Sequence, residues 1–317
     1  MALKNDILSL MEQNRTKIFS GRELSEHFDV SRNAVWKAVN TLKEEGHTIE
    51  SVGRKGYRFA KDSNVLSEEG VRVSLIESLH DIRIFVAQAV GSTNEEAKHM
   101  AAQYPNEPLV FISDKQYSGR GRMGRSFYSP AETGLYMSCV FYPKPREPFS
   151  KAVIYTAMAA VAVVRAINSV CTVRPKIKWI NDLYIDERKV AGILTEAETD
   201  LETGETHRLT VGIGINITTA DFPLEIRGKA ASLGVNVVRN RLAANIINEF
   251  YTLAAEKPDD LMEEYRRDCF IIGRDVTFSD GLQLFKGKVA GVGDNCELIL
   301  DVDREKLTFS HGEILVF

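Results

Sequence analysis

The chain has 317 residues, with 40 lysines and arginines, 44 aspartates and glutamates, and a formal net charge of −4 at pH 7. This length has room for two or three domains that each bury a core. The near-neutral balance gives no sign of nucleic-acid binding by the chain as a whole.

Cysteine spacing and apolar runs bear on the cellular compartment. The four cysteines lie far apart, with no CxxC pair, which favours core thiols in a reducing compartment over disulfides or a metal site. The N-terminus lacks the apolar run of a signal peptide, and the longest apolar stretch, residues 152–164, is too short to span a bilayer. These features predict a soluble cytoplasmic protein with no membrane partner and no protein-built metal site.

The first 46 residues have the spacing of three helices. Apolar residues from Leu3 to Met11 recur at helical intervals, and Ser20 with Glu23 forms a capping box for a short second helix. Ser31 caps a third helix over residues 32–45. The side chains that we place on the buried face of this third helix are Val35, Trp36, Val39 and Leu42.

Two helices joined by a tight turn predict a helix-turn-helix, whose second helix enters the DNA major groove. A hairpin follows over residues 47–59, with a basic turn at residues 53–56, and this is typical of the wing of a winged helix. Many winged helices mediate only protein contacts, and that alternative stays open. We predict DNA binding, as a dimer, because the helix and the wing carry a polar and basic set: Ser31, Arg32, Asn33, Lys37, Arg54 and Lys55.

After a linker at residues 61–64, the most informative segment is residues 119–125, which read GRGRMGR. Arginine forks bind phosphate or carboxylate oxygens, and the glycines let the backbone approach a ligand, so the segment predicts an anion-binding loop. It also matches GxGxxG, but residues 126–130 start no helix, as a dinucleotide-binding turn requires. A solvated basic loop is the other interpretation.

Strands and polar turns surround this loop in the sequence. Residues 85–90 predict a strand that leads into Gly-Ser-Thr-Asn at a helix N-terminus, where Thr93 and Glu96 match a capping box. Residues 109–112 and 135–141 predict two further strands of a mixed sheet.

Three strands, the last two of which contain glycine, complete the central region. We predict one strand over residues 176–185, which pairs across a turn at 186–187 with residues 189–194, and another at residues 211–216. Glycine inside a strand often marks the close approach of a ligand or another backbone. We therefore expect one narrow slot, with Lys189 inside it and with Asn181 and Asn216 at its polar ends.

From residue 271 the pattern changes to short alternating strands separated by Gly and Asp turns, which predicts a small SH3-like β-barrel. The fold prediction is therefore α+β: an N-terminal winged helix-turn-helix, a central mixed sheet with helices, and the C-terminal barrel. The predicted boundaries are residues 1–62, 66–268 and 269–317.

These segments, taken in order, resemble the bifunctional biotin protein ligases that also repress the biotin operon. The resemblance rests on the winged helix, the G-S-T-N turn, Q-Y-S-G-R-G-R-M-G-R, K-W-I-N-D, R-K-V-A-G-I-L and G-I-G-I-N. It covers essentially the whole chain. Many relatives end with an arginine after the G-E-I segment; this chain ends at Phe317 without one.

The resemblance implies an ATP-dependent ligase that makes biotinyl-5′-adenylate, with Mg²⁺ on the phosphates, and passes biotin to one lysine of a biotin carboxyl carrier protein. It also implies an adenylate-bound homodimer that represses genes at operator DNA. The implied catalytic residues are Lys189, Arg122 and Arg120. The implied biotin-binding set is Ser92, Thr93, Asn94, Gln116, Arg120, Gly121, Arg122 and Lys189, and the implied nucleotide-binding set is Trp179, Asn181, Asn216 and Phe222.

Other functions stay possible from the residues alone. A ligand-sensing repressor without catalysis would not need Lys189 or the full arginine set. A lipoate or octanoate ligase on a related fold is a third possibility, and a nicotinamide-dependent enzyme is the weakest. No residue identifies itself as the general base for biotin transfer; Asp182 is a candidate by position only.

Overall fold

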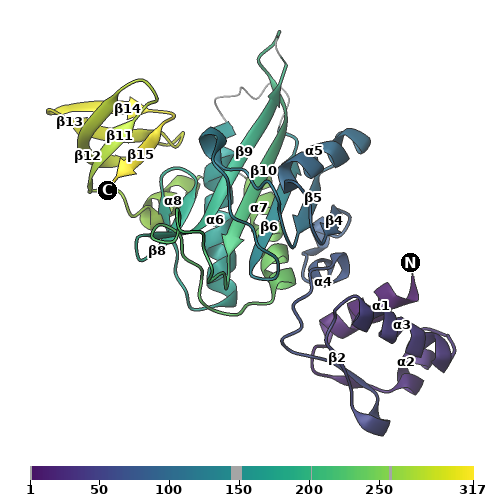
Figure 1. Ribbon diagram of the computed structural model, residues 1–317. Coiled ribbons are helices and arrows are strands. Elements are labelled where there is room, and N and C mark those ends of the chain that lie inside the picture. The colour runs from purple at the N-terminus through teal and green to yellow at the C-terminus, as the bar shows by residue number, and fades with distance from the viewer. Residues whose placement is uncertain (1, 144–151, 201, 257–258) are drawn as a thin grey trace. The chain divides into compact units, whose positions relative to one another are not determined.

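The structure is a computed structural model that describes residues 2–143, 152–200, 202–256 and 259–317. The chain divides into two compact units. The first contains residues 1–81 and 237–245, and the second contains residues 82–236 and 246–317. Figure 1 shows the elements of both units, which are described separately below.

Three helices and a small sheet form the core of the first unit (Figure 1). The helices are α1 (Leu3–Gln13), α2 (Gly21–His27) and α3 (Arg32–Glu44). The caps form as predicted, since Ser20 accepts from the Glu23 amide and Ser31 from the Ala34 amide. The wing consists of β2 (Ile49–Ser51), the short 3₁₀ helix η1 (Gly53–Lys55) and β3 (Tyr57–Phe59), and β3 also pairs with β1 (Ile18–Phe19).

The prediction that Trp36 points inward is wrong. Its side chain is 53% exposed, while Val35, Val39 and Leu42 are buried as predicted. At 100° per residue, the buried stripe of α3 continues through Ala38, and Trp36 falls on the flank of the helix. Its large apolar ring suggested burial, but the helical period places it at the surface.

The segment predicted as a linker is held within the first unit. The side chain of Asn64 donates to the carbonyl of Val237 (3.0 Å) and accepts from the amide of Arg239 (2.8 Å). The unit continues through α4 (Glu68–Arg72) and η2 (Glu77–Leu79). The three predicted domain boundaries stay a prediction.

A seven-stranded mixed sheet organises the second unit. Its order is β4-β5-β6-β10-β9-β8-β7, and β4 with β5 is its parallel pair. The strands are β4 (Arg83–Ala87), β5 (Leu109–Ser113), β6 (Gly134–Phe141), β7 (Lys176–Lys178), β8 (Asp182–Ile185), β9 (Arg188–Thr199) and β10 (Thr206–Asn216). This confirms the predicted mixed sheet.

The prediction of a single strand over residues 176–185 is wrong, because these residues form two strands, β7 and β8. The chain reverses at residues 179–181, so that β7 pairs antiparallel with β8 and Lys178 stands opposite Asp182. The alternating apolar pattern is the same in one long strand and in two short ones, and no Gly or Pro marks the turn. The second half pairs with β9, as expected.

Helices cover both faces of this sheet. Glu196 of β9 bonds to Asn94 of α5 (Thr93–Gln103), whereas its neighbour Thr195 bonds to Thr156 of α6 (Ala152–Val170). Because adjacent residues of a strand point to opposite faces, α5 and α6 lie on opposite sides of the sheet. By length and composition α6 is apolar enough to span a membrane, but 67% of its apolar window is buried in the fold.

The remaining helices are α7 (Arg239–Glu256) and α8 (Leu261–Asp268). A five-stranded antiparallel sheet follows, in the order β14-β13-β12-β11-β15. Its strands are β11 (Asp275–Ser279), β12 (Leu284–Val292), β13 (Leu298–Val302), β14 (Glu305–Phe309) and β15 (Glu313–Val316). The short strands predicted after residue 271 are present, but the hydrogen-bonded order ends at β14 and β15, so the sheet is not closed into the predicted barrel.

Candidate active site

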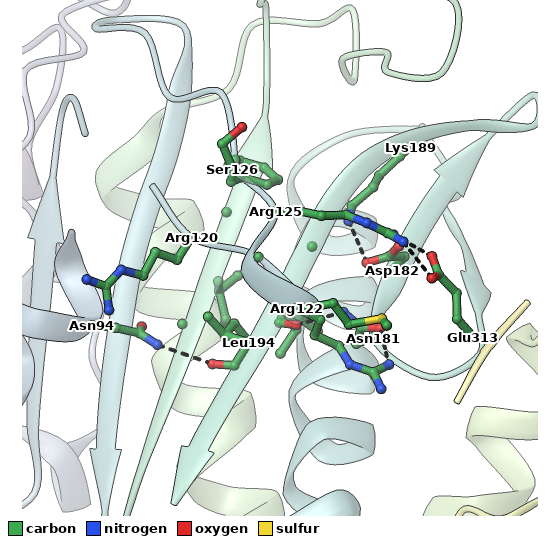
Figure 2. Close-up of a pocket in the computed structure, with 18 of the residues that line it drawn as sticks. Asn94, Arg120, Arg122, Arg125, Ser126, Asn181, Asp182, Lys189, Leu194 and Glu313 are labelled. Carbon is green, nitrogen blue, oxygen red and sulfur yellow. Dashed lines mark hydrogen bonds and ion pairs between the residues drawn. The ribbon is translucent and has the colours of Figure 1, made fainter. Parts of the chain in front are cut away.

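A cavity opens on the face of the large sheet that carries α5. Its lining comes from the start of α5, the arginine loop at residues 119–126, the β7–β8 turn, the glycine-rich parts of β9 and β10, and residues 312–314 next to β15. Figure 2 shows Arg120 extending towards the side of Asn94, while Arg125 and Lys189 lie on the side of Glu313 and Asp182. The cavity therefore gathers segments that lie more than 200 residues apart in sequence, from Ser92 to Ile314.

Hydrogen-bonding side chains gather where α5 begins. The side-chain oxygen of Gln116 accepts from the Thr93 amide (2.8 Å), and the Ser138 hydroxyl lies 2.6 Å from Asn94 Oδ1. Asn94 Nδ2 in turn donates to Glu196 (2.6 Å). The predicted capping box is absent, because Ser92 is the N-cap and makes no side-chain capping bond. These buried polar groups fix one another before any ligand arrives, which suits recognition of a polar ring.

Glycines form the floor of the cavity. A Cβ atom at Gly212 would lie 2.2 Å from Oδ1 of Asn94, and one at Gly214 would lie 2.6 Å from the ring of Phe127. A Cβ atom at Gly192 would lie 2.9 Å from the ammonium of Lys189. The glycine-rich strands thus leave room for side chains of the site itself, which agrees with the predicted close approach.

Each arginine of the loop has a partner in the protein. Arg120 pairs with Glu95 of α5 at 2.8 Å, and Arg122 donates to the side chain of Asn181 and to the carbonyl of Gly312. Arg125 forms a forked pair with Glu313, and this guanidinium holds the pKa of the Glu313 carboxyl below its usual range. An anionic ligand would therefore compete with carboxylates for Arg120 and Arg125, whereas the partners of Arg122 are uncharged.

Lys189 lies inside the cavity. Its ammonium is 2.6 Å from Oδ1 of Asp182, and its side chain is 32% exposed (Figure 2). Asp182 of β8 stands opposite Gly192 of β9, and the missing side chain at Gly192 leaves room for the ammonium of Lys189 to reach it. The carboxylate keeps a lysine at the cavity wall that would otherwise extend into water.

A second lysine, which the sequence prediction missed, closes the other end. Lys178 is buried, donates to the carbonyl of Ile314 (2.9 Å), and lies over the ring of Phe317. Burial lowers the pKa of this ammonium from its ordinary value. The neighbouring Trp179 donates its indole N–H to the carbonyl of Cys296. Lys178 and Trp179 thus connect the wall of the cavity to the C-terminal sheet through these two hydrogen bonds.

Ten of the twelve residues predicted for biotin and nucleotide line the cavity: Ser92, Thr93, Asn94, Gln116, Arg120, Gly121, Arg122, Trp179, Asn181 and Lys189. The other two lie outside the lining. Asn216 is buried and donates to the carbonyl of Ala231, and Phe222 packs near Tyr128. The sequence prediction missed the lining residues Phe127 and Glu313. Phe127 directly follows the arginine loop and Glu313 lies in the G-E-I segment, so their positions in the sequence were the available signal.

The predicted DNA-binding residues are in the first unit. Arg32, Asn33 and Lys37 are exposed on α3, and the side chain of Ser31 caps that helix. Arg54 and Lys55 are exposed on the η1 turn of the wing. The helix and the wing of one unit therefore both present these side chains to solvent.

Comparisons with known proteins agree with both parts. A family model described as an HTH domain matches residues 4–58, and one described as the biotin/lipoate A/B protein ligase family matches residues 86–216. The "Bifunctional ligase/repressor BirA" of Bacillus spizizenii is 30% identical over 94% of both chains. The protein of the same name from Bacillus subtilis is 30% identical over 95% of this chain and 94% of its own. A solved biotin protein ligase from Aquifex aeolicus, in complex with biotin and ATP, has the same fold over 74% of this chain and 98% of its own, with a TM-score of 0.62 and 24% identity.

Proposed function

Since the chain belongs to the family of bifunctional biotin ligase/repressors, we propose that it activates biotin with ATP to biotinyl-5′-adenylate and transfers biotin to one lysine of a biotin carboxyl carrier protein. The adenylate-bound dimer acts as a DNA-binding repressor of biotin synthesis or uptake genes. The observation that carries the ligase assignment is the cavity in which Lys189 and the loop arginines surround a glycine floor.

The proposed biotin end lies at the start of α5. Ser92, Thr93, Asn94 and Gln116 are the donors and acceptors for the ureido ring, and their mutual hydrogen bonds keep them oriented. The biotin carboxylate then points towards Arg122 and Lys189, with Arg120 and Gly121 closing the loop over it. Side chains held by a surrounding polar network need little reorganisation on binding.

The proposed nucleotide end lies between the loop and the C-terminal sheet. Trp179 and Asn181 line that part of the cavity. We assign Asn216 and Phe222 to the adenine side, supported by the position of Asn216 at the end of β10 and of Phe222 in the segment after it. Asn216 Oδ1 is buried without a hydrogen-bond partner among the described residues, so it has an acceptor available for a ligand donor.

The adenylation step joins two anions. The biotin carboxylate, already ionised, attacks the α-phosphorus of ATP, the new C–O–P bond forms, and pyrophosphate leaves with the electron pair of the broken P–O bond. Lys189, Arg120 and Arg122 stabilise the charge that develops on the phosphate oxygens, which is commonly the largest single contribution to such catalysis. The closed loop also keeps water from the mixed anhydride.

Magnesium, which the family implies, would screen the triphosphate charge and assist the departure of pyrophosphate. The two carboxylates of the lining are already paired, Asp182 with Lys189 and Glu313 with Arg125. The described residues contain no group of three or more acidic, histidine or cysteine side chains that would hold a metal. This donor set fits an ion carried mainly by phosphate oxygens and water.

Three further assignments belong to this proposal. The repressor is a homodimer on its operator, the protein is cytoplasmic and has no membrane partner, and the C-terminal sheet is of the SH3-like class. Four free cysteines support a reducing compartment. For the second half-reaction we keep Asp182 as the candidate base, supported by its place in the lining.

Transfer of labelled biotin to a purified carrier domain, with ATP and Mg²⁺, tests the ligase assignment, with lipoate and octanoate as competing substrates.

Replacing Lys189 by alanine removes the charge at the reacting phosphate, and we expect adenylate formation to fall by about 100-fold or more. The control is Arg188→Ala, which removes an exposed cation next to it in β9 and outside the cavity lining. Biotin binding without any transfer by the wild-type chain would identify a sensor-repressor instead.

A further inference from the structure

The basic side chains of residues 17–59 differ in how they are neutralised. Lys17, Arg22 and Arg58 each pair with a glutamate of the same unit, at 2.5 to 3.4 Å. Four others are exposed and have no carboxylate partner in the described part of the chain: Arg32, Lys37, Arg54 and Lys55. Within residues 17–59, the exposed cations without a carboxylate partner therefore lie on α3 and at the tip of the wing, a distribution that suits a polyanion.

Trp36 lies within this charged surface. Its side chain is 53% exposed, although a tryptophan is normally among the more buried residues of a fold. On α3 it follows Arg32 by four residues and is adjacent in sequence to Lys37. The helical repeat therefore places its ring beside Arg32, while Lys37 lies on the adjoining face of the helix.

The flank of α3 that carries Trp36 continues towards the wing. Lys43 stands seven residues, or about two turns, after Trp36, and its ammonium donates to the hydroxyl of Ser51 in β2 (3.1 Å). Arg32, Trp36 and Lys43 thus follow one flank of α3, and this flank meets the wing. Asn33 and Lys37 point from the neighbouring, outward face.

We propose that Trp36 is a DNA-backbone contact. This inference rests on the proposed docking of α3 in the major groove. If Asn33 and Lys37 face the base edges while Arg54 and Lys55 reach neighbouring phosphates, the flank between them lies over the sugar–phosphate wall of the groove. There the indole ring packs on deoxyribose and its N–H donates to a phosphate oxygen, a use of both the apolar body and the polar tip of tryptophan.

A backbone contact by an uncharged side chain makes a specific prediction. Trp36→Ala should weaken binding roughly 10- to 100-fold, because it removes a large apolar contact area. The loss should be similar on every DNA sequence, since the backbone carries no base identity. The salt dependence should not change, because a tryptophan releases no counterion, whereas Lys37→Ala should lower the salt slope by about one.

The test uses the full chain with biotin and ATP and two duplexes of equal length, one selected from a random pool by the wild-type protein and one unselected. Fluorescence anisotropy measures the affinity of both at several salt concentrations. The control variant is Gln13→Ala, which changes an exposed neutral side chain of α1. Trp36→Phe keeps an aromatic ring without the N–H and should lose only part of the affinity; circular dichroism checks that each variant is folded.

The outcomes separate this inference from the repressor assignment. Equal losses on both duplexes, with an unchanged salt slope, support the backbone contact. A loss confined to the selected duplex would place Trp36 on a base and overturn the proposal, as would wild-type affinity in Trp36→Ala when Lys37→Ala is impaired. If the wild-type chain binds neither duplex, the proposed repressor function fails first.

Discussion

Gly192, Gly212 and Gly214 leave space for three side chains of the site. They do not serve to make the backbone flexible. Each would-be Cβ atom falls closer than 3.0 Å to Lys189, Asn94 or Phe127. None of the three glycines has a positive φ angle, so conformational freedom is not the reason for them. At the residue scale, the absence of a side chain in the strand therefore decides where the site's own side chains lie.

Replacing Gly212 by alanine tests this directly. The added methyl group would meet Oδ1 of the buried Asn94, which is held by Ser138 and Glu196 and has little room to move. We expect a rise in the KM for biotin of roughly tenfold or more, with a smaller change in kcat, because the change displaces a ground-state contact. The control is Gly291→Ala in β12, where an added Cβ atom has nothing within 4 Å. An unchanged KM in Gly212→Ala would remove Asn94 from the biotin site.

At the scale of elements, α3 and the wing are held together over a buried histidine. His47 follows α3, is 5% exposed, and packs near the ring of Phe59. Its pKa is lowered to about 4, chiefly by burial; Glu45 opposes this shift, and Arg15 and Lys4 add to it. A neutral histidine is therefore part of the folded winged helix.

This predicts a pH dependence for the first unit. The folded-state pKa of His47 lies below its ordinary value of 6.5, so the unfolded chain takes up the proton first as the pH falls. The stabilisation is complete above pH 6.5 and is lost between there and about pH 4; the shift corresponds to roughly 3 kcal/mol. Hydrogen exchange of α3, corrected for the intrinsic rate, should show weaker protection at pH 5 than at pH 7.

The matched variants are His47→Gln, which cannot titrate and should flatten this pH dependence, and His27→Gln, which changes an exposed histidine of α2. If the wild-type chain and His47→Gln lose protection equally between pH 7 and pH 5, another group is responsible.

At the scale of the whole molecule, the proposed ligase and repressor share one intermediate. Under this proposal, adenylate that remains bound favours the DNA-binding state, and adenylate that is consumed does not. Such coupling requires only that the ligand bind one state more tightly than the other, and typical coupling energies correspond to 5- to 150-fold changes in affinity.

Adding carrier domain to the chain, with limiting biotin, should therefore weaken its binding to the selected duplex by about 5-fold or more. A carrier domain whose acceptor lysine is replaced by arginine should have no such effect, because it cannot take up biotin. Anisotropy of the labelled duplex follows this directly. Equal release by both carrier domains would indicate competition for a surface instead of consumption of the intermediate.

Much of the fold could be predicted because its signals are local. The caps at Ser20 and Ser31, the wing and the five C-terminal strands depend on residues a few positions apart. The arginine loop and the glycine strands also indicate an anion site by composition alone. Where local signals were ambiguous, as for the ring of Trp36 and the turn at residues 179–181, the prediction was wrong.

The sequence by itself determined the kinds of chemistry present and the order of the elements that carry it, because caps, periods and residue types are properties of short segments. Only the tertiary structure decided which partners those residues have. The pairs Arg125 with Glu313, Lys178 with Ile314 and Arg122 with Gly312 join segments more than 130 residues apart. Such contacts follow from how the sheets pack, and no spacing along the chain encodes them.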